Sequence, residues 1–438
     1  MKQKRTMVAV AMVSSVAAAL VGCSSSGGPG SGASASSDTG VTLQYWATNQ
    51  GKDLAADTKI LEPELEKFQE QTGIKIDLQV LPWATINTKL LAAIASGNGP
   101  DVANFGNTNA PQYGATGALL GMTSADLGGT SRFTSVALAT AGAAPLTSVP
   151  LYAQVWAMVY NKKMFTDAGL QAPTTWQDLI ADAKKISNPS TGTYGLAFAA
   201  GSPSADCQLS FIFAQQNGGS PFNSDNKPTF TTDGMVAGAQ QLIDLMNDGL
   251  IDPAAAQYTS DPQAFAPFEQ NKAAMLFSQT GFISTLASLG MTPDQYGIIA
   301  IPAPSPLPPG GKDVSSTVAG TNIAIFKNTE HKDAALKFVN FMTSADEQEI
   351  LDKEYQLLPV LKNASLSFMS DQTVAKTYSD ILADKAVPFP ITTQNTAYLN
   401  STGAALKQLL GQAASGQKIT SAMVKSAMQS AQDQLPRQ

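Results

Sequence analysis

Alternation between strand-like and helix-like patterns is the clearest feature of the chain from residue 41 onward. The run 41–46 is rich in residues that favour strands, and apolar residues then recur at helical spacing through 57–71, with Gly73 placed to end the helix. Apolar and polar residues alternate from Ile74 to Val80, which predicts a second strand. A helix and a short strand are predicted within 85–105. This order predicts a sheet with helices on its faces.

The same alternation returns in the second half of the chain, so the predicted fold class is α/β throughout. Thr174 and Thr175 precede a predicted helix over 176–186 as candidate caps. A Pro/Gly-rich stretch at 302–311 lies between two predicted strands and is unsuited to regular structure. Ser344–Glu347 has the spacing of a capping box at the start of a further helix.

The first 22 residues have the parts of a bacterial export signal. A basic start and an apolar run of small residues lead to Leu20-Val21-Gly22, directly before Cys23. The apolar run is too short for a comfortable membrane span. We predict cleavage before Cys23 and lipidation of that cysteine, which holds the protein at the outer face of the cytoplasmic membrane. The alternatives are an uncleaved anchor and a cysteine that stands at this place by chance. Residues 24–40 are mostly Ser and Gly and predict a flexible tether.

Composition excludes several function classes. Without Lys2, Lys4 and Arg5 the chain has 24 basic residues against 34 acidic ones, and it has no basic run, so nucleic acid is a poor partner. Cys207 is the one cysteine left besides Cys23, and we expect a buried, inert thiol there. The length suits two domains of ordinary size.

Catalytic signatures are missing. His331 is the single histidine and lies in a polar segment, whereas Ser–His–Asp and Cys–His systems need a histidine beside the nucleophile. One His and one Cys are too few for a zinc site, and the glycine patterns at 28–32 and 310–311 lack the other residues of a phosphate or dinucleotide loop. We expect no metal, no cofactor and no catalysis. A pair of facing carboxylates stays open.

Five short motifs occur in a fixed order along the chain. They are ASGNGPDV at 95–102, YNK at 160–162, TTWQDL at 174–179, AGTN at 319–322 and DAALKF at 333–338. Each is weak alone. Together they resemble the extracellular solute-binding proteins of ABC importers, in particular the sugar-binding branch (family 1) typified by maltose-binding protein, from residue 41 to about 430.

The resemblance implies a two-lobe periplasmic-binding-protein-like fold with an interlobe cleft, crossing hinge strands and hinge closure on the solute. The segment 150–162 resembles the first crossing and 302–318 the return. Lobe one is then 41–151 with 314–344, and lobe two is 152–313 with 345–438. The implied partners are a small solute, most simply a sugar, and the transmembrane subunits of an ABC permease, with the receptor a monomer.

Candidate ligand-binding residues are carried over by their positions in the resembling segments. They combine planar amides, one acid and aromatic faces, which suits a sugar ring with apolar faces and a hydroxyl rim. The candidates are Trp46, Asn49, Asn104, Phe105, Asn107, Gln154, Asp206, Gln208, Phe282 and Gly320.

A structural role competes with ligand binding at most of these positions. Trp46 ends an apolar strand and is as well suited to a core. Asn104 and Asn107 suit turn hydrogen bonds, and Asp206 suits an N-cap of the following helix. Gly320 favours close backbone approach over direct binding.

Three other functions compete with a sugar receptor. The same fold suits another polar solute, such as a polyamine or an amino acid derivative, although a cation would want several acids around aromatic faces. A secreted carboxylate-dependent hydrolase needs two acids at a fixed separation. A structural surface lipoprotein needs no ligand at all.

Overall fold

The computed structural model describes residues 38–436 except 52, 143 and 370, and leaves the side chains of 84, 261, 262 and 282–284 outside the described part. The described residues belong to one compact unit that begins at Asp38. The predicted signal, the lipidated Cys23 and nearly all of the tether lie outside the described residues and stay predictions.

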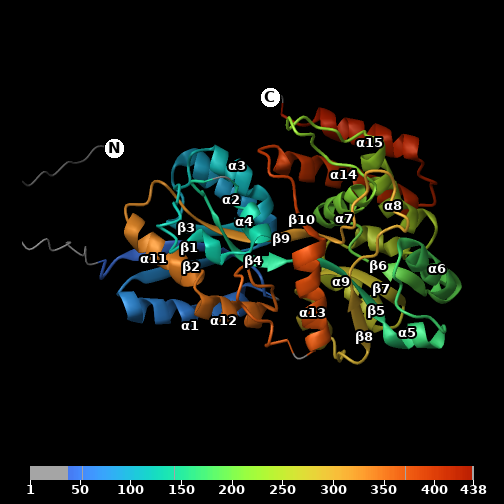
Figure 1. Ribbon diagram of the computed structural model, residues 1–438, viewed down its shortest axis with the longest axis horizontal. Coiled ribbons are helices and arrows are strands. Elements are labelled where there is room, and N and C mark those ends of the chain that lie inside the picture. Colours follow the sequence, from blue (N-terminus) through green and yellow to red (C-terminus); the bar gives the residue numbers. More distant parts are fainter. Residues whose placement is uncertain (1–37, 52, 143, 370, 437–438) are drawn as a thin grey trace, which may run out of the picture. The chain divides into compact units, whose positions relative to one another are not determined.

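The strands form two separate sheets, with helices packed against each (Figure 1). The first sheet has the order β10-β9-β3-β1-β2, with β4 beside β9, and the second has the order β6-β7-β5-β8. The first contains β1 (Thr42–Thr48), β2 (Lys75–Leu81), β3 (Val102–Gly106), β4 (Val149–Gln154), β9 (Ser316–Ile325) and β10 (Ala386–Pro388). The second contains β5 (Trp156–Asn161), β6 (Tyr194–Ala197), β7 (Ala273–Gln279) and β8 (Tyr296–Ile299). The α/β class predicted from the sequence is confirmed.

Helices flank both sheets. Near the first sheet are α1 (Leu54–Thr72), α2 (Trp83–Ser96), α3 (Ala110–Ala115), α4 (Ser135–Ala139), α11 (Lys332–Met342) and α12 (Ala345–Tyr355). Near the second are α5 (Lys162–Asp167), α6 (Trp176–Ile186), α7 (Pro203–Gln216), α8 (Asp233–Asn247), α9 (Asp261–Glu269), α10 (Phe282–Ser288), α13 (Gln372–Asp380), α14 (Asn395–Ala414) and α15 (Ser421–Asp433). Short helices are η1 (Asn107–Asn109), η2 (Thr130–Arg132), η3 (Pro189–Thr191), η4 (Pro253–Gln257) and η5 (Ile381–Lys385).

The helix ends follow the capping chemistry of the sequence. Gly73 ends α1 at φ 73°, in the left-handed region that favours glycine. Thr175 and Asp178 form a complete capping box at the start of α6. Ser344 caps α12 through the Glu347 backbone N–H, but the Glu347 carboxylate lies 3.4 Å from Lys67 of α1. The predicted capping box at α12 is therefore only half formed, because Lys67 is the competing partner.

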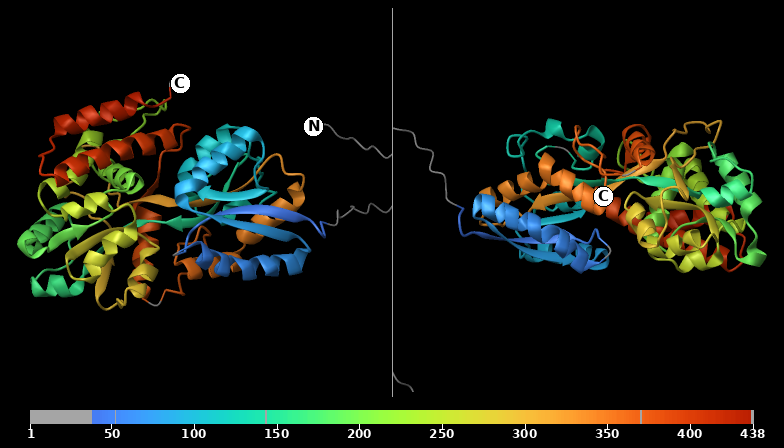
Figure 2. Two further views of the ribbon diagram at one scale, coloured as in Figure 1. Left: turned by 180° about the vertical axis from the view of Figure 1, so that it is seen from behind. Right: turned by 90° about the horizontal axis from the view of Figure 1, so that it is seen from below.

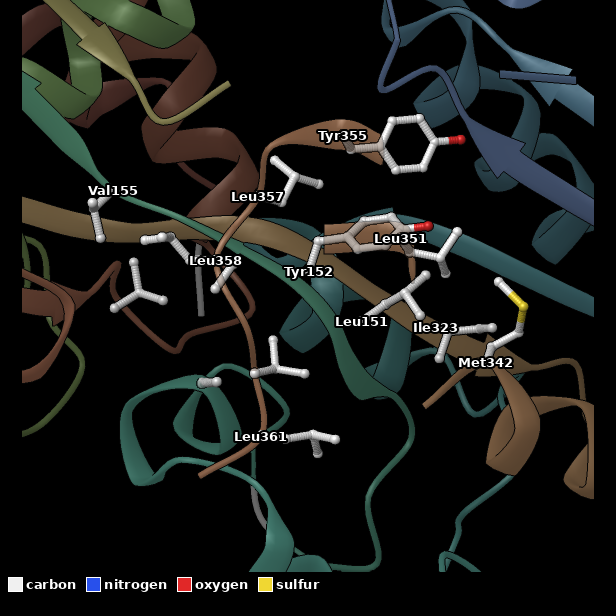
Figure 3. Close-up of a cluster of buried hydrophobic side chains, with 14 of the residues drawn as sticks. Leu151, Tyr152, Val155, Ile323, Met342, Leu351, Tyr355, Leu357, Leu358 and Leu361 are labelled. Carbon is white, nitrogen blue, oxygen red and sulfur yellow. The ribbon is translucent and has the colours of Figure 1, made fainter. Parts of the chain in front are cut away.

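The chain crosses from the first sheet to the second between β4 and β5, and it returns through the segment between β8 and β9. Beside this crossing lies a cluster of buried apolar side chains from β4, β9 and the segment after α12 (Figure 3). Leu151, Ile323 and Leu358 in this cluster are fully buried, and Leu358 bonds through its backbone to Ala153 of β4. The apolar cluster and these backbone hydrogen bonds stabilise the crossing strands next to the candidate site.

The exact division of the chain into lobes stays a prediction. The predicted lobe one (41–151 with 314–344) contains β1, β2, β3 and β9 of the first sheet. The predicted lobe two includes α12 and β10, yet α12 packs on α1 and α11 (Figure 2), and β10 pairs with β9. Below, lobe one means the first sheet with its flanking helices, and lobe two means the second sheet with its own.

Candidate functional site

A cavity of about 590 Å³ lies between the two lobes, where strand ends and helix starts of both meet. Strand ends of α/β sheets are the usual place for ligands. None of the described lining residues carries a charged side chain. The lobe-one wall consists of Asn49, Gln50, Trp83, Asn87, Gly106, Asn107, Thr108, Asn109, Gln154, Ala319, Gly320 and Thr321, and the lobe-two wall of Ser202, Pro203, Ser204, Gln208, Gln279, Thr396, Leu399 and Asn400. The site therefore offers amides, hydroxyls and one indole ring.

The loop after β1 forms one part of the wall and is held from behind by Asp57. This carboxylate is fully buried in the first turn of α1 and accepts hydrogen bonds from the backbone N–H groups of Gln50 (3.1 Å) and Gly51 (2.9 Å) and from the Asn49 side chain. Burial, followed by the nearby Asp57 carboxylate, raises the pKa of Tyr355 on α12. Asp57 thus ties the loop to α1.

Gln208 on α7 is the centre of the opposite wall. Its side-chain oxygen accepts hydrogen bonds from the Trp156 indole N–H at 2.8 Å and from the Gln279 amide at 3.1 Å. Its NH₂ group donates to the Ser204 hydroxyl at 3.1 Å. Because the indole can only donate, the orientation of the Gln208 amide is fixed.

Two hydrogen bonds join the lobes at the edge of the cavity. Asn395 at the start of α14 donates to the Thr108 carbonyl at 2.8 Å, and Thr396 donates to the Asn109 side-chain oxygen, also at 2.8 Å. Asn109 in turn donates to Asn87 of α2 at 3.0 Å. A chain of neutral polar groups therefore runs from α2 across η1 to α14.

Trp83 is the aromatic residue of the described lining, and sequence reasoning missed it. It is the first residue of α2 and is 44% exposed, and its six-membered ring lies against the backbone of Gly106. Pro82-Trp83 directly after a predicted strand was the available signal, because a tryptophan at a strand end that starts a helix lies at the ligand edge of an α/β sheet.

Five predicted binding residues line the cavity, namely Asn49, Asn107, Gln154, Gln208 and Gly320. Gly320 also has the structural role expected from the sequence, which is to allow close backbone approach. Its φ is 143°, and a Cβ there would lie 2.1 Å from the Tyr152 carbonyl oxygen, so the close pairing of β9 with β4 needs glycine. Whether these residues bind a ligand stays a prediction.

Four predicted residues lie outside the described lining. Asn104 and Phe105 are buried because β3 is a central strand covered on both faces, and Phe105 packs edge-on against Tyr113 at 4.9 Å. Trp46 is half-buried and packs against the cluster that contains Phe105. The structure gives all three of these residues a place in or against the core.

Asp206 is the fourth. The expectation that it caps the following helix is wrong, because Ser202 is the N-cap of α7 and Asp206 lies inside the helix, fully buried. Burial raises its pKa well above the usual value, against the opposing effect of Lys407. Neither of its oxygens has a hydrogen-bond partner among the described residues. A neutral carboxyl group suits such surroundings.

Phe282 begins α10, but its side chain lies outside the described part, so its predicted stacking role stays a prediction. Cys207 is buried, as expected. Within the described residues, no three His, Cys, Asp or Glu side chains are grouped so as to hold a metal ion. In the same part of the chain, no helix has the length and apolar character needed to cross a membrane.

Comparison with known proteins places this geometry in a family. The family model described as "Bacterial extracellular solute-binding protein" matches residues 51–349, and the chain belongs to this family. The members are binding proteins of ABC importers, so the class expected from the sequence motifs is confirmed.

Individual relatives are distant in sequence but align with most of the chain. A protein of Brucella abortus (strain 2308), named as a binding protein without a stated ligand, is 26% identical over 324 residues, which cover 72% of this chain and 76% of the relative. A maltooligosaccharide ABC transporter solute-binding lipoprotein of Streptococcus pneumoniae (strain ATCC BAA-255 / R6) is 23% identical over 82% of both chains. The solved structure of an ABC substrate-binding protein of Listeria monocytogenes in complex with cycloalternan matches with a TM-score of 0.74 at 20% identity, over 90% of this chain and 97% of that one. The two-lobe fold with its interlobe cleft is thereby confirmed.

Proposed function

We propose that this protein is the receptor of an ABC importer for a neutral sugar, which it binds in the interlobe cavity and delivers to the transmembrane permease without transforming it. The observation that carries the proposal is the lining of the cavity. Its described residues supply amides, hydroxyls and one indole ring, and none of them supplies a charge.

A sugar fits this chemistry because each hydroxyl both donates and accepts a hydrogen bond, while the ring faces are apolar. Amides offer the matching donor and acceptor, and an exposed tryptophan offers a flat apolar surface. The cavity volume of about 590 Å³ falls within the usual range for small-molecule sites. The names of the Streptococcus relative and of the Listeria complex, which both refer to saccharides, support the same ligand class.

A cationic solute such as a polyamine is less well supported. Asp206 is the one acid among the predicted binding residues, and it lies buried inside α7 with a raised pKa. No described lining residue replaces it. The same lack of paired acids in the described lining disfavours a carboxylate-dependent hydrolase.

A thermal-shift panel tests the proposal on the chain without residues 1–22. Maltose, maltotriose, cellobiose, tagatose, spermidine and arginine are each added at millimolar concentration. A ligand at about 100 times its Kd stabilises the folded state by roughly 2.7 kcal/mol, so a bound sugar raises Tm measurably. The largest shift is expected from a neutral sugar, and Gln154→Ala and Phe282→Ala are each expected to reduce it. The largest shift from spermidine would transfer the function to the polyamine alternative.

Lipid attachment at Cys23 is tested separately in cells. Cys23→Ala removes the thiol that carries the acyl chains and is expected to release the protein from the membrane fraction, while sugar binding by the released protein is unchanged. Membrane retention of Cys23→Ala equal to that of the wild type would contradict lipid anchoring.

A further inference from the structure

The loop after β1 places two amide side chains, Asn49 and Gln50, in the cavity wall. An amide has an acceptor oxygen on one side and a donor NH₂ group on the other. Its orientation therefore decides which kind of ligand group it can bind. In this loop, hydrogen bonds from behind the wall fix both orientations.

Asn49 is fixed by partners that can only accept. Its NH₂ group donates to the Asp57 carboxylate and to the Gly51 carbonyl, the latter at 3.0 Å. Turning the amide over would bring its oxygen against two acceptors. The Asn49 oxygen is consequently the atom left for the cavity.

Gln50 is fixed through a relay that begins at a backbone N–H. The Thr48 N–H, which can only donate, meets the Asn104 side-chain oxygen at 2.6 Å, and the Asn104 NH₂ group donates to the Tyr45 phenol at 2.9 Å. The Thr48 hydroxyl donates its single proton to the same Asn104 oxygen at 2.8 Å. Toward Gln50 this hydroxyl can therefore only accept a hydrogen bond, and the Gln50 NH₂ group donates to it at 2.9 Å. The Gln50 oxygen is left for the cavity.

We propose that the buried Asp57 and Asn104 are positioning residues that turn the side-chain oxygens of Asn49 and Gln50 toward the ligand. This end of the cavity is then a patch of acceptors, which selects a ligand with two hydroxyl protons to donate there. The proposal rests on the proposed function and adds a specificity rule to it. A fluorine or methoxy group in place of either hydroxyl leaves an acceptor facing an acceptor.

Binding of maltose, or of cellobiose or tagatose if maltose does not bind, is measured by calorimetry. In Asp57→Asn, the oxygen of the new amide still accepts from the loop backbone, but its NH₂ group now faces the NH₂ group of Asn49. The Asn49 amide must then turn over, which brings its NH₂ group into the cavity. We expect Kd to rise about tenfold or more, since a good hydrogen bond becomes a donor–donor conflict. Asp101→Asn is the matched control. Asp101 accepts the Gln44 N–H at 2.8 Å at the opposite end of β1, and its variant is expected to keep the wild-type Kd.

The relay is tested at Thr48, a buried residue outside the described lining. Thr48→Val removes the hydroxyl that orients Gln50 and is expected to weaken binding, while Thr48→Ser keeps the hydroxyl and restores it. Monodeoxyfluoro derivatives of the same sugar give a readout that stability does not affect. In the wild type, the derivatives fluorinated at two of the positions are expected to bind at least about tenfold more weakly than the parent sugar. In Asp57→Asn, one of these two derivatives is expected to bind as tightly as the parent sugar. Equal penalties in the wild type and Asp57→Asn would overturn the role of Asp57.

A measurement without ligand separates this proposal from the proposed function. Side-chain NH₂ protons of Asn49 and Gln50, observed by nuclear magnetic resonance, are expected to exchange slowly with water because they are turned inward. Asn49 is expected to lose this protection in Asp57→Asn, and Gln50 in Thr48→Val. Fast exchange of both groups in the wild type would refute the orientation, even if a sugar binds. Slow exchange without binding of any sugar would refute the proposed function instead.

Discussion

Removal of the indole at Trp83 is the sharpest test of how the cavity holds a sugar. Trp83 is 44% exposed at the start of α2, whereas Trp156, which bonds Gln208, is only 2% exposed. Trp83→Ala therefore takes an open apolar face out of the cavity and leaves the core intact. Some loss of stability is also expected, because the rest of the side chain is buried and its ring lies against Gly106, so Tm is followed in parallel with binding.

The magnitude follows from the exposed area. A tryptophan side chain has roughly 250 Å² of surface, so an exposure of 44% leaves on the order of 100 Å² open. A sugar ring stacked on one face covers about half of this. At about 25 cal/mol per Å² the lost contact is worth roughly 1.3 kcal/mol, which corresponds to a Kd about tenfold higher.

Calorimetric titration with the sugar that gives the largest thermal shift measures this loss. Leu91→Ala is the matched control, since Leu91 is 39% exposed on the same helix and lies outside the described lining. Trp83→Phe keeps a smaller aromatic face and is expected to give an intermediate Kd. An unchanged Kd in Trp83→Ala would show that the sugar does not stack on α2.

Two further predictions concern stability. Burial, together with the nearby Glu64, raises the pKa of Glu347 to about 8 against the opposing effect of Lys67, so the folded state holds a proton that the unfolded chain releases near pH 4.5. The free energy of unfolding is therefore expected to fall as the pH rises from about 5 to 8, by at most roughly 1.4 kcal/mol per pH unit. In thermal melts, Glu347→Gln is expected to flatten this dependence on pH. The same slope in the variant as in the wild type would contradict the raised pKa. Gly320→Ala is expected to lower the free energy of unfolding in denaturant titrations by more than about 2 kcal/mol, because it adds both a clash and a strained φ. Gly416→Ala is the control, since Gly416 has a φ of 89° and open space around it, so its variant adds only the strain. Equal losses in the two glycine variants would show that the approach of β9 to β4 does not require glycine.

The arrangement of elements could be predicted from the sequence because it depends on local periodicity and capping. The strict alternation at 74–80 corresponds to β2, and the glycine expected to end the first helix does so. The apolar spacing predicts a start of that helix at Asp57, three residues late, because Asp53 caps the helix before any apolar residue of the helical stripe appears. Periodicity marks the buried face of a helix, whereas the first turn is set by a single side chain.

Among the candidates near β1 and β3, those that follow the end of their strand are the ones in the described lining of the cavity. Asn49 lies directly after β1 and lines the cavity. Asn104 and Phe105 lie inside β3, two residues and one residue before its last residue, Gly106. Both are buried, because β3 is a central strand that is covered on both faces. That difference depends on which neighbours flank β3, and the neighbour on one side, β9, comes more than 200 residues later in the chain. No local pattern contains this information.

The polarity of the two walls explains why a polyol suits this cavity better than a simple ion. On lobe one, Asn49 and Gln50 present oxygens, because their NH₂ groups are engaged behind the wall. On lobe two, the Gln208 oxygen already accepts two hydrogen bonds and its NH₂ group makes one, so the second N–H is the group left to bind a ligand. Of these three amide groups, an ammonium group would satisfy only the acceptors and a carboxylate only the donor. A hydroxyl donates to one wall while it accepts from the other, so a sugar that satisfies both walls also holds the two lobes together.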